Sequence, residues 1–305
     1  MKNTKTLLLS ISLCLFTFNG FTQEQEAQKK EWTKTGTISF LFNQAAFNSE
    51  WQGGGTSNYA ANLGLTYDAN YRKEKITWDN RLVIDYGIAN QKDQRFTRKT
   101  NDRFEFNSLI GKEIKKSLWY YSFFLNAKTQ LTGGYTFGED TDGNDVRSKS
   151  TKFLSPGYFQ VGQGMLWKKN DNLKVNIAPA TARLIIVDGI FTNVGQDQTN
   201  IDAFNDRRYF GVKANETTRF EFGAAIGAYG KFTLFKNVVI ENTLNLYSNY
   251  LEYPQNVDID YTMNLLMSVN KWITANITFQ SIYDDNAVKG FQVRETLGVG
   301  LTYGF

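Results

Sequence analysis

The sequence predicts a single transmembrane antiparallel up-and-down β-barrel of about twelve strands, of the outer-membrane type. Three observations predict this fold: long segments that alternate apolar and polar side chains, connections that alternate between short and long, and aromatic residues that follow the short connections. Alternation with a period of two indicates a strand, because successive side chains point to opposite faces. The segments also reach the length of roughly 9–11 residues that a strand needs to cross a bilayer.

The expected strands follow one another along the whole chain. The clearest one runs from Arg219 to Phe235, where apolar residues such as Phe220 and Phe222 alternate with Glu221 and other polar or small residues. The approximate spans are 35–47, 57–72, 75–88, 103–114, 118–132, 157–168, 172–187, 218–234, 238–250, 257–269, 272–283 and 292–305.

The connections between these strands alternate between two lengths. Five short turns lie at 73–74, 115–117, around Asn170, at 235–237 and at 270–271, and six longer loops lie between them. In outer-membrane barrels the short turns are periplasmic and the long loops are extracellular. Aromatic residues near the short turns are typical of the headgroup level of a membrane; they are Tyr71, Trp78, Trp119, Trp167, Phe235 and Trp272.

The N-terminus has the pattern of a secretory signal peptide. Lys2 and Lys5 precede an apolar run from Leu7 to Phe18, which is too short to span a bilayer as a helix. We expect residues 1–22 to be the signal peptide, 23–34 a short periplasmic lead-in and 35–305 the barrel. Cys14 also allows a lipoprotein interpretation, against which the bulky Leu13 argues.

Composition excludes several classes of function. The chain has no His, and Cys14 is its single Cys, so a mature chain would contain neither thiol nor imidazole. Disulfides, Cys or His metal ligands and His-based catalysis are therefore excluded, and we expect no cofactor and no enzymatic activity. Loss of Lys2 and Lys5 lowers the formal net charge from +4 to about +2, which does not suggest a nucleic-acid partner.

Charged residues of both signs occupy the face opposite the apolar one. In a lipid-embedded barrel they must point into the lumen. There they either pair across a narrow lumen and fill it, or line a wet path for a solute. We select Arg81, Asp85, Asp258 and Asp260 as candidate binding residues. Asp258 and Asp260 lie two apart on one strand face, which leaves a carboxylate-only hydrolase formally open.

Two loops have unusual compositions. In "NSEWQGGGTS", Gly53 and Gly54 permit close backbone approach and Trp51 is able to anchor the loop or cap the lumen, so these three residues complete the candidate binding set. In "GEDTDGND", Asp140, Asp142 and Asp145 supply oxygen atoms of the type that Ca²⁺ prefers. The spacing does not match an EF-hand, and a solvated loop without metal is the simpler interpretation.

Two blocks of the chain resemble a Bacteroidetes-type outer-membrane family known as domain of unknown function 3078. The first is "FNQAAFNSEWQGG", and the second spans Lys236 to Asp285, with "LYSNYL", "PQNVD" and "YDD" as its specific parts. Gln52, Gly55 and Tyr247 depart from the family pattern. The resemblance implies an outer-membrane barrel and no established activity.

The segment "ETLGVGLTYGF" reads as the closing strand of the barrel. Its apolar alternates from Leu297 to Phe305 form a lipid-facing row, and the glycines between them leave room in the lumen or let the strand bend. Tyr303 and Phe305 resemble the signal by which the barrel assembly machinery recognises outer-membrane proteins. The expected location is the cell outer membrane, with membrane lipid, this machinery and a small solute as partners.

Three functional hypotheses follow from these patterns. The leading one is a non-enzymatic outer-membrane barrel that binds a small solute or passes it through a polar lumen. The second is a structural or interaction barrel, occluded by charge pairs and by the long loop from Asp188 to Thr218, which carries Phe204, Arg207, Arg208, Tyr209 and Phe210. The third is a lipid-active barrel enzyme, which the absence of His disfavours.

Overall fold

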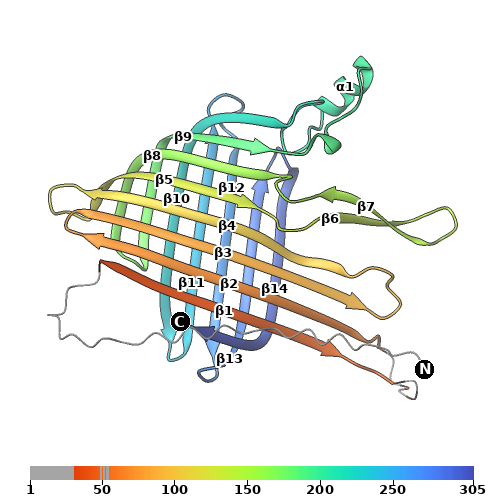
Figure 1. Ribbon diagram of the computed structural model, residues 1–305, viewed down its shortest axis with the longest axis horizontal. Helices are drawn as coiled ribbons and strands as arrows, with labels where there is room; N and C mark the ends of the chain where they lie inside the picture. The colour runs from red at the N-terminus through yellow and green to blue at the C-terminus, as the bar shows by residue number, and fades with distance from the viewer. Residues whose placement is uncertain (1–30, 49, 51, 53–54) are drawn as a thin grey trace, which may run out of the picture. The chain divides into compact units, whose positions relative to one another are not determined.

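Twelve antiparallel strands close on themselves into a barrel (Figure 1). The computed structural model describes residues 31–48, 50, 52 and 55–305. Each strand pairs with its neighbours in antiparallel register, and the order around the barrel is β1-β14-β13-β12-β11-β10-β9-β8-β5-β4-β3-β2. The fold class predicted from the sequence is therefore confirmed.

The strands lie where the alternation predicts them. The barrel strands are β1 (Trp32–Ala45), β2 (Asn58–Lys73), β3 (Ile76–Gln91), β4 (Arg98–Glu113), β5 (Trp119–Thr129), β8 (Gly157–Asn170), β9 (Leu173–Ile186), β10 (Thr218–Phe235), β11 (Val238–Asn249), β12 (Val257–Ser268), β13 (Ile273–Asp284) and β14 (Val288–Gly304). Strand β1 begins at Trp32, so the last residues of the expected lead-in already belong to the barrel. The expected signal peptide lies outside the described residues.

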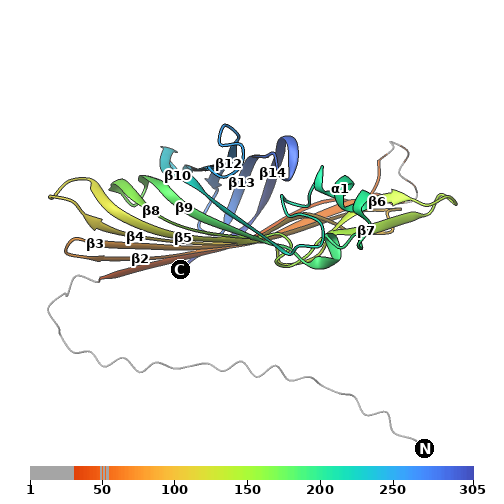
Figure 2. The ribbon, with the colours of Figure 1, turned by 90° about the horizontal axis from the view of Figure 1, so that it is seen from above.

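The long loops contain elements that the alternation did not predict. Strands β6 (Gly134–Glu139) and β7 (Asp145–Thr151) form a separate two-stranded hairpin. The loop between β9 and β10 contains the 3-10 helix η1 (Gly189–Phe191) and helix α1 (Gln198–Asn205), whose N-cap Asp197 accepts a hydrogen bond from the Asn200 amide. Hairpin and helix lie at the same end of the barrel (Figure 2). Neither helix of the described chain is long or apolar enough to span a bilayer.

Large apolar side chains cover the outer surface of the barrel. Phe40, Phe123 and Leu301 are about half exposed, and an apolar surface of this extent suits contact with lipid rather than water. Aromatic residues gather at the end that carries the short turns. There the ring of Trp32 lies 5.1 Å from that of Tyr71, and the ring of Trp272 lies 5.6 Å from that of Tyr303.

The barrel closes through a short seam between β1 and β14. Six residue pairs, from Thr37↔Gly304 to Phe42↔Val299, form its ladder. Phe305 extends the seam, because its backbone N–H donates to the Gly36 carbonyl at 2.9 Å and its carbonyl accepts from the Gly36 N–H at 2.7 Å. The Phe305 ring lies over Gly36 and stacks 6.4 Å from the ring of Tyr67.

Gly300 lets the two strands of the seam approach closely. A Cβ atom at this position would lie 2.0 Å from the Phe40 carbonyl oxygen and 2.8 Å from the Leu41 Cα, which are backbone atoms that cannot rotate away. Gly300 thus serves a close approach of β14 to β1.

We expect Gly300→Val to destabilise the closed barrel by about 3 kcal/mol or more, because the side chain would push β1 away from β14. The folded fraction is measured by the mobility shift between unheated and heated samples on a denaturing gel. Gly138→Val in the β6–β7 hairpin is the matched control, since its Cβ would meet no atom within 4 Å. Equal folded fractions for the two variants would contradict the steric role of Gly300.

Candidate functional site

The lumen contains a cavity of about 920 Å³ lined mainly by polar side chains. All twelve barrel strands contribute to it, because the inward alternates of each strand meet in the interior. Charged side chains occur along the whole length of the lumen. From the short-turn end to the long-loop end they form four tiers of ion pairs.

The lowest tier surrounds Asp79 on β3. Its carboxylate is 5% exposed and accepts hydrogen bonds from Lys168 Nζ at 2.7 Å and Lys174 Nζ at 2.8 Å. Arg72 Nη2 lies 2.5 Å from the other oxygen and also binds Asp171 in the neighbouring turn. Three cations on three strands thus converge on one buried anion close to the short-turn end of the barrel.

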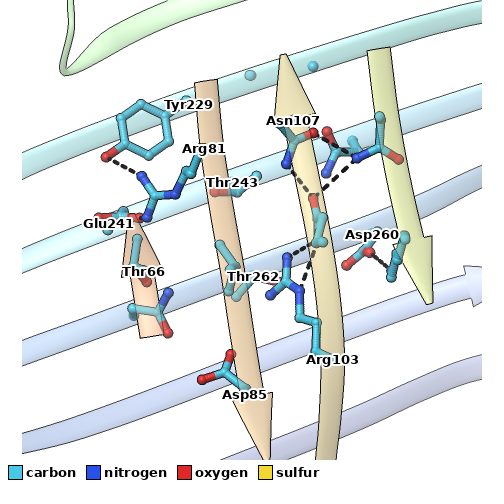
Figure 3. A pocket seen from close by; sticks show the side chains of 18 of the residues that line it. Thr66, Arg81, Asp85, Arg103, Asn107, Tyr229, Glu241, Thr243, Asp260 and Thr262 are labelled. Atoms are coloured by element: carbon cyan, nitrogen blue, oxygen red, sulfur yellow. Dashed lines mark hydrogen bonds and ion pairs between the residues drawn. The ribbon is translucent and has the colours of Figure 1, made fainter. Parts of the chain in front are cut away.

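The second tier connects opposite walls of the barrel. Arg81 on β3 forms an ion pair with Glu241 on β11, and these strands are six apart in the twelve-strand order. The same guanidinium donates to the Tyr229 hydroxyl at 3.2 Å and lies 3.7 Å from an Asp68 oxygen (Figure 3). This pair therefore crosses the full width of the lumen.

The third tier contains a second contact across the lumen. Lys128 on β5 pairs with Asp260 on β12, which also accepts a hydrogen bond from Gln280 at 3.0 Å. On the β4 wall, Arg103 Nε donates to Glu105 at 2.9 Å (Figure 3). Both cations of this tier are therefore matched by a carboxylate.

The highest tier is centred on Arg183 of β9. Its Nε donates to Glu221 at 2.6 Å, its Nη2 donates to Asp258 at 2.5 Å, and its guanidinium lies 3.8 Å from the centre of the Tyr247 ring. Glu221 has no exposed surface and also lies 2.8 Å from Arg219 Nε. Arg183 is thus held by two anions and a ring at once.

A kink in β9 directs Arg183 inward. Buried residues alternate through Asn176 and Ala178 and resume at Thr181 and Arg183, so the inward parity changes at Pro179. The ladders to both neighbouring strands shift register at the same point. Proline has no N–H to donate to the ladder, and it is found at bulges for this reason. Without the extra residue Arg183 would face lipid.

The loop between β9 and β10 packs over the long-loop end of the barrel. Tyr209 and Phe210 contact a small apolar cluster of Ile185, Val187 and Val212, and Phe210 also lines the cavity. Lys152 forms an ion pair with Asp188 at the start of this loop, and the pairing lowers the pKa of the Asp188 carboxyl group. Arg208 binds Glu252 at 2.9 Å. These contacts thus hold the loop against the long-loop end of the barrel.

Four of the residues predicted to bind lie in this lumen. Arg81, Asp85, Asp258 and Asp260 all line the cavity. The other three, Trp51, Gly53 and Gly54, lie outside the described residues.

The weak calcium candidates lie elsewhere, on the turn between β6 and β7. There Asp140 accepts hydrogen bonds from the backbone of Asp142 and Asn144, while Asp145 accepts one from Arg95, so they form a turn and not a cluster of free carboxylates.

A different acidic group has oxygen atoms close enough for a metal ion. Carboxylate oxygens of Asp258, Asp284 and Asp285 lie within 4.8 Å of one another at the long-loop end, the one such group of three in the described chain. Asp258 is bound by Arg183 and Asp285 accepts a hydrogen bond from Asn256 at 2.6 Å. Asp284 also accepts a hydrogen bond from the Asn286 amide at 3.0 Å, so protein donors already bind all three carboxylates.

The sequence analysis missed several cations of the site. Arg103 lies two residues from Glu105 and Lys174 lies two residues from Asn176, and both of these neighbours line the cavity, so period-two counting from them finds the two cations. To predict that Arg183 points inward, one must also know that the inward alternation of β9 shifts by one residue at Pro179. Proline in the middle of a predicted strand is the signal that would have revealed the bulge.

Residues 42–135 match the sequence model of a family described as "Protein of unknown function (DUF3078)". This segment belongs to that family. The DUF3078 segment extends from the end of β1 to the start of β6 and carries Arg81 and Asp85. The predicted family is thus confirmed over the first block of resemblance and the strands after it, whereas the second block, 236–285, lies outside the matched DUF3078 segment. No curated protein matches the chain.

Solved structures similar to the DUF3078-containing chain are outer-membrane proteins. An outer membrane channel from Pseudomonas putida F1 is 7% identical, with 92% of this chain and 99% of the channel covered and a TM-score of 0.37. The beta domain of the Bordetella autotransporter BrkA is 10% identical, with 90% and 99% covered and a TM-score of 0.33. Similarities this low transfer no function.

We expect Asp79→Asn to destabilise the barrel by about 3–5 kcal/mol, because three cations would lose their shared anion in a buried site. The measurement is the free energy of unfolding by urea in liposomes. The control is Asp171→Asn, which removes a half-exposed partner of the same cations and should cost at most about 1 kcal/mol. Equal losses for the two variants would show that burial of Asp79 does not set its contribution.

Proposed function

We propose that the protein is a non-enzymatic outer-membrane barrel that binds a small polar solute in its lumen and passes it when the pairs across the lumen separate. The observation that carries this proposal is the polar cavity of about 920 Å³ inside the barrel. Pockets for small molecules have volumes of about 300–1,000 Å³. Mixed charges on the cavity wall favour a polar solute over an apolar one.

The exposed surface supports a location in the outer membrane. Apolar residues cover the barrel wall, and the aromatic residues at the short-turn end suit the headgroup level. Membrane lipid is therefore the partner of the outer face. The short turns would lie in the periplasm and the loop with α1 outside the cell, and fractionation with surface proteolysis of that loop tests this orientation.

Two ion pairs cross the lumen in this conformation. Arg81–Glu241 and Lys128–Asp260 each join distant walls, so a solute that crosses the barrel must displace both pairs. The side chains of these two pairs keep 16–29% of their surface exposed, so a solute in the cavity reaches them. We infer that the pairs hold the lumen narrow at rest and yield to a solute that offers replacement charges.

A structural barrel with an occluded lumen is the second candidate. The apolar cluster of Ile185, Val187 and Val212 under Tyr209 and Phe210 favours it, because this packing covers the long-loop end. A lipid-active enzyme has less support, since Asp258 and Asp260 are each bound by a cation of their own. Both carboxylates thus act as ion-pair partners and not as a neighbouring acid and base.

We expect the double variant Arg81→Ala, Glu241→Ala to raise single-channel conductance in planar bilayers several-fold above that of the wild type. Removing both partners widens the lumen and leaves neither member of the pair without its counterion. Asp68 loses its 3.7 Å contact with Arg81, but its side chain is partly exposed, so the barrel still folds. The control is Glu31→Ala, Lys73→Ala, an ion pair of 2.7 Å at the periplasmic rim that does not line the cavity. If the lumen variant conducted no better than this control, passage would be excluded and the occluded structural barrel favoured.

We also propose that Tyr303 and Phe305 form the signal for the barrel assembly machinery. Deletion of Phe305 should reduce the amount of assembled protein in the outer membrane severely, because Phe305 also closes the seam on Gly36. Barrels that do assemble should keep wild-type conductance, since Phe305 does not line the cavity. Quantification of surface-exposed protein against Phe291→Ala, an outward residue high on the same strand, provides the comparison. Normal surface levels of the deletion would refute the assembly role.

A further inference from the structure

Two charges near the third tier have no ionic partner. The other charges at that height are matched, Arg103 by Glu105 and Lys128 by Asp260. Asp85 on β3 and Arg294 on β14 also line the cavity, but neither forms an ion pair with any residue that the structure describes. A carboxylate and a guanidinium that face the same cavity without a counterion indicate which charges a ligand of this cavity carries.

Asp85 forms no ion pair with the cation that lies opposite it on the neighbouring strand. It lies directly opposite Arg103 in the β3–β4 register, yet Arg103 donates to Glu105 on its own strand at 2.9 Å. Within the described part of the chain the Asp85 carboxylate accepts no hydrogen bond. Figure 3 shows it pointing into the lumen, away from the bonded pair. Its acceptor oxygens are therefore open to the contents of the cavity.

Arg294 is held in place by neutral groups. Its Nη1 donates to Asn101 across the lumen and its Nη2 donates to the side-chain oxygen of Gln280 at 3.0 Å. Gln280 in turn donates to Asp260 at 3.0 Å, which fixes its orientation. Amide oxygens position a guanidinium without neutralising it, so the positive charge of Arg294 remains available.

We propose that Asp85 and Arg294 are the two anchors of a binding site for a zwitterionic solute, with Asp85 receiving its ammonium group and Arg294 its carboxylate. This inference rests on the proposed solute-binding function and names the class of solute. Each of these charges raises the free energy of the barrel when it lies away from bulk water without a counterion. A guanidinium binds a carboxylate through charge-assisted hydrogen bonds, which are about twice as strong as neutral ones.

A solute with one charge satisfies the site only in part. An anion would pair with Arg294 but leave Asp85 unpaired and repel it, and a cation would do the reverse. A zwitterion pairs with both anchors and adds no net charge to a lumen whose other charges are already matched. The arrangement therefore selects for two opposite charges on one molecule.

Lys231 is the competing anchor for the anionic group. It lines the cavity nearer the short-turn end, is exposed there, and has no ion pair in the structure as described. Arg294 is the better candidate because two hydrogen bonds fix it at the height of Asp85, whereas no partner orders Lys231. The test therefore includes Lys231→Gln.

The test measures binding by titration calorimetry of the full-length barrel in detergent. The probes are glycine, glycylglycine and triglycine, which are zwitterions with increasing charge separation, and N-acetylglycine and glycinamide, which carry one charge each. We expect at least one zwitterion to bind at least about tenfold more tightly than either singly charged probe. The preferred length then reports the distance between the anchors.

The variants give a crossed pattern that a structural role would not produce. Asp85→Asn should lower zwitterion affinity about tenfold and leave N-acetylglycine binding unchanged or tighter, and Arg294→Gln should do the same for glycinamide. Glu295→Gln, which removes an outward-facing carboxylate beside Arg294, and Lys231→Gln should bind as the wild type does. Mobility shifts on denaturing gels confirm that each variant is folded.

The outcomes separate this inference from the proposed function. If N-acetylglycine or glycinamide bound as tightly as every zwitterion, or if Lys231→Gln reproduced the loss expected of Arg294→Gln, the two-anchor site would be wrong while solute binding stood. If none of the five probes bound and the Arg81→Ala, Glu241→Ala variant did not conduct, the proposed function itself would fall. Conductance without binding of any probe would overturn the zwitterion site alone.

Discussion

The structure depends on one constraint: each backbone N–H and C=O group in a hydrocarbon layer must bond within the chain. Twelve paired strands satisfy it only because β1 and β14 also pair, through six residue pairs and the bonds between Gly36 and Phe305. The glycine at position 300 permits this approach. Closure removes the sheet edges and also creates an interior, so the seam is the origin of both the fold and the site.

Closure creates the lumen, because the face of each strand that does not contact lipid then points into the interior. Charged residues that lipid would reject converge from twelve strands, and they find partners far away in the sequence. Arg81 meets Glu241 and Lys128 meets Asp260 across the interior. These pairs make the lumen narrow but not filled, since a cavity remains between them. The site thus arises because the inward charges of a closed barrel pair with one another, whereas Asp85 and Arg294 form no ion pair in the described structure.

Local rules account for most of the strands and fail at identifiable places. Period-two alternation located all twelve barrel strands, because one face contacts lipid and the other does not. It missed β6, β7 and α1, which lie in loops where no membrane imposes the pattern. It also missed Arg183, because Pro179 inserts a bulge and exchanges the two faces of β9. A single residue without an N–H thus turned Arg183 into the lumen, where it joins Arg219 in binding Glu221.

The sequence by itself determined the barrel, its number of strands, the positions of the short turns and the inward position of Arg81, Asp85, Asp258 and Asp260. These features depend on alternation and length, which are local. Only the tertiary structure decided which charges pair, because partners such as Arg81 and Glu241 are 160 residues apart and meet only through the shared closure of the wall. For the same reason it alone showed that Asp85 and Arg294 have no ion-pair partner among the residues that the structure describes.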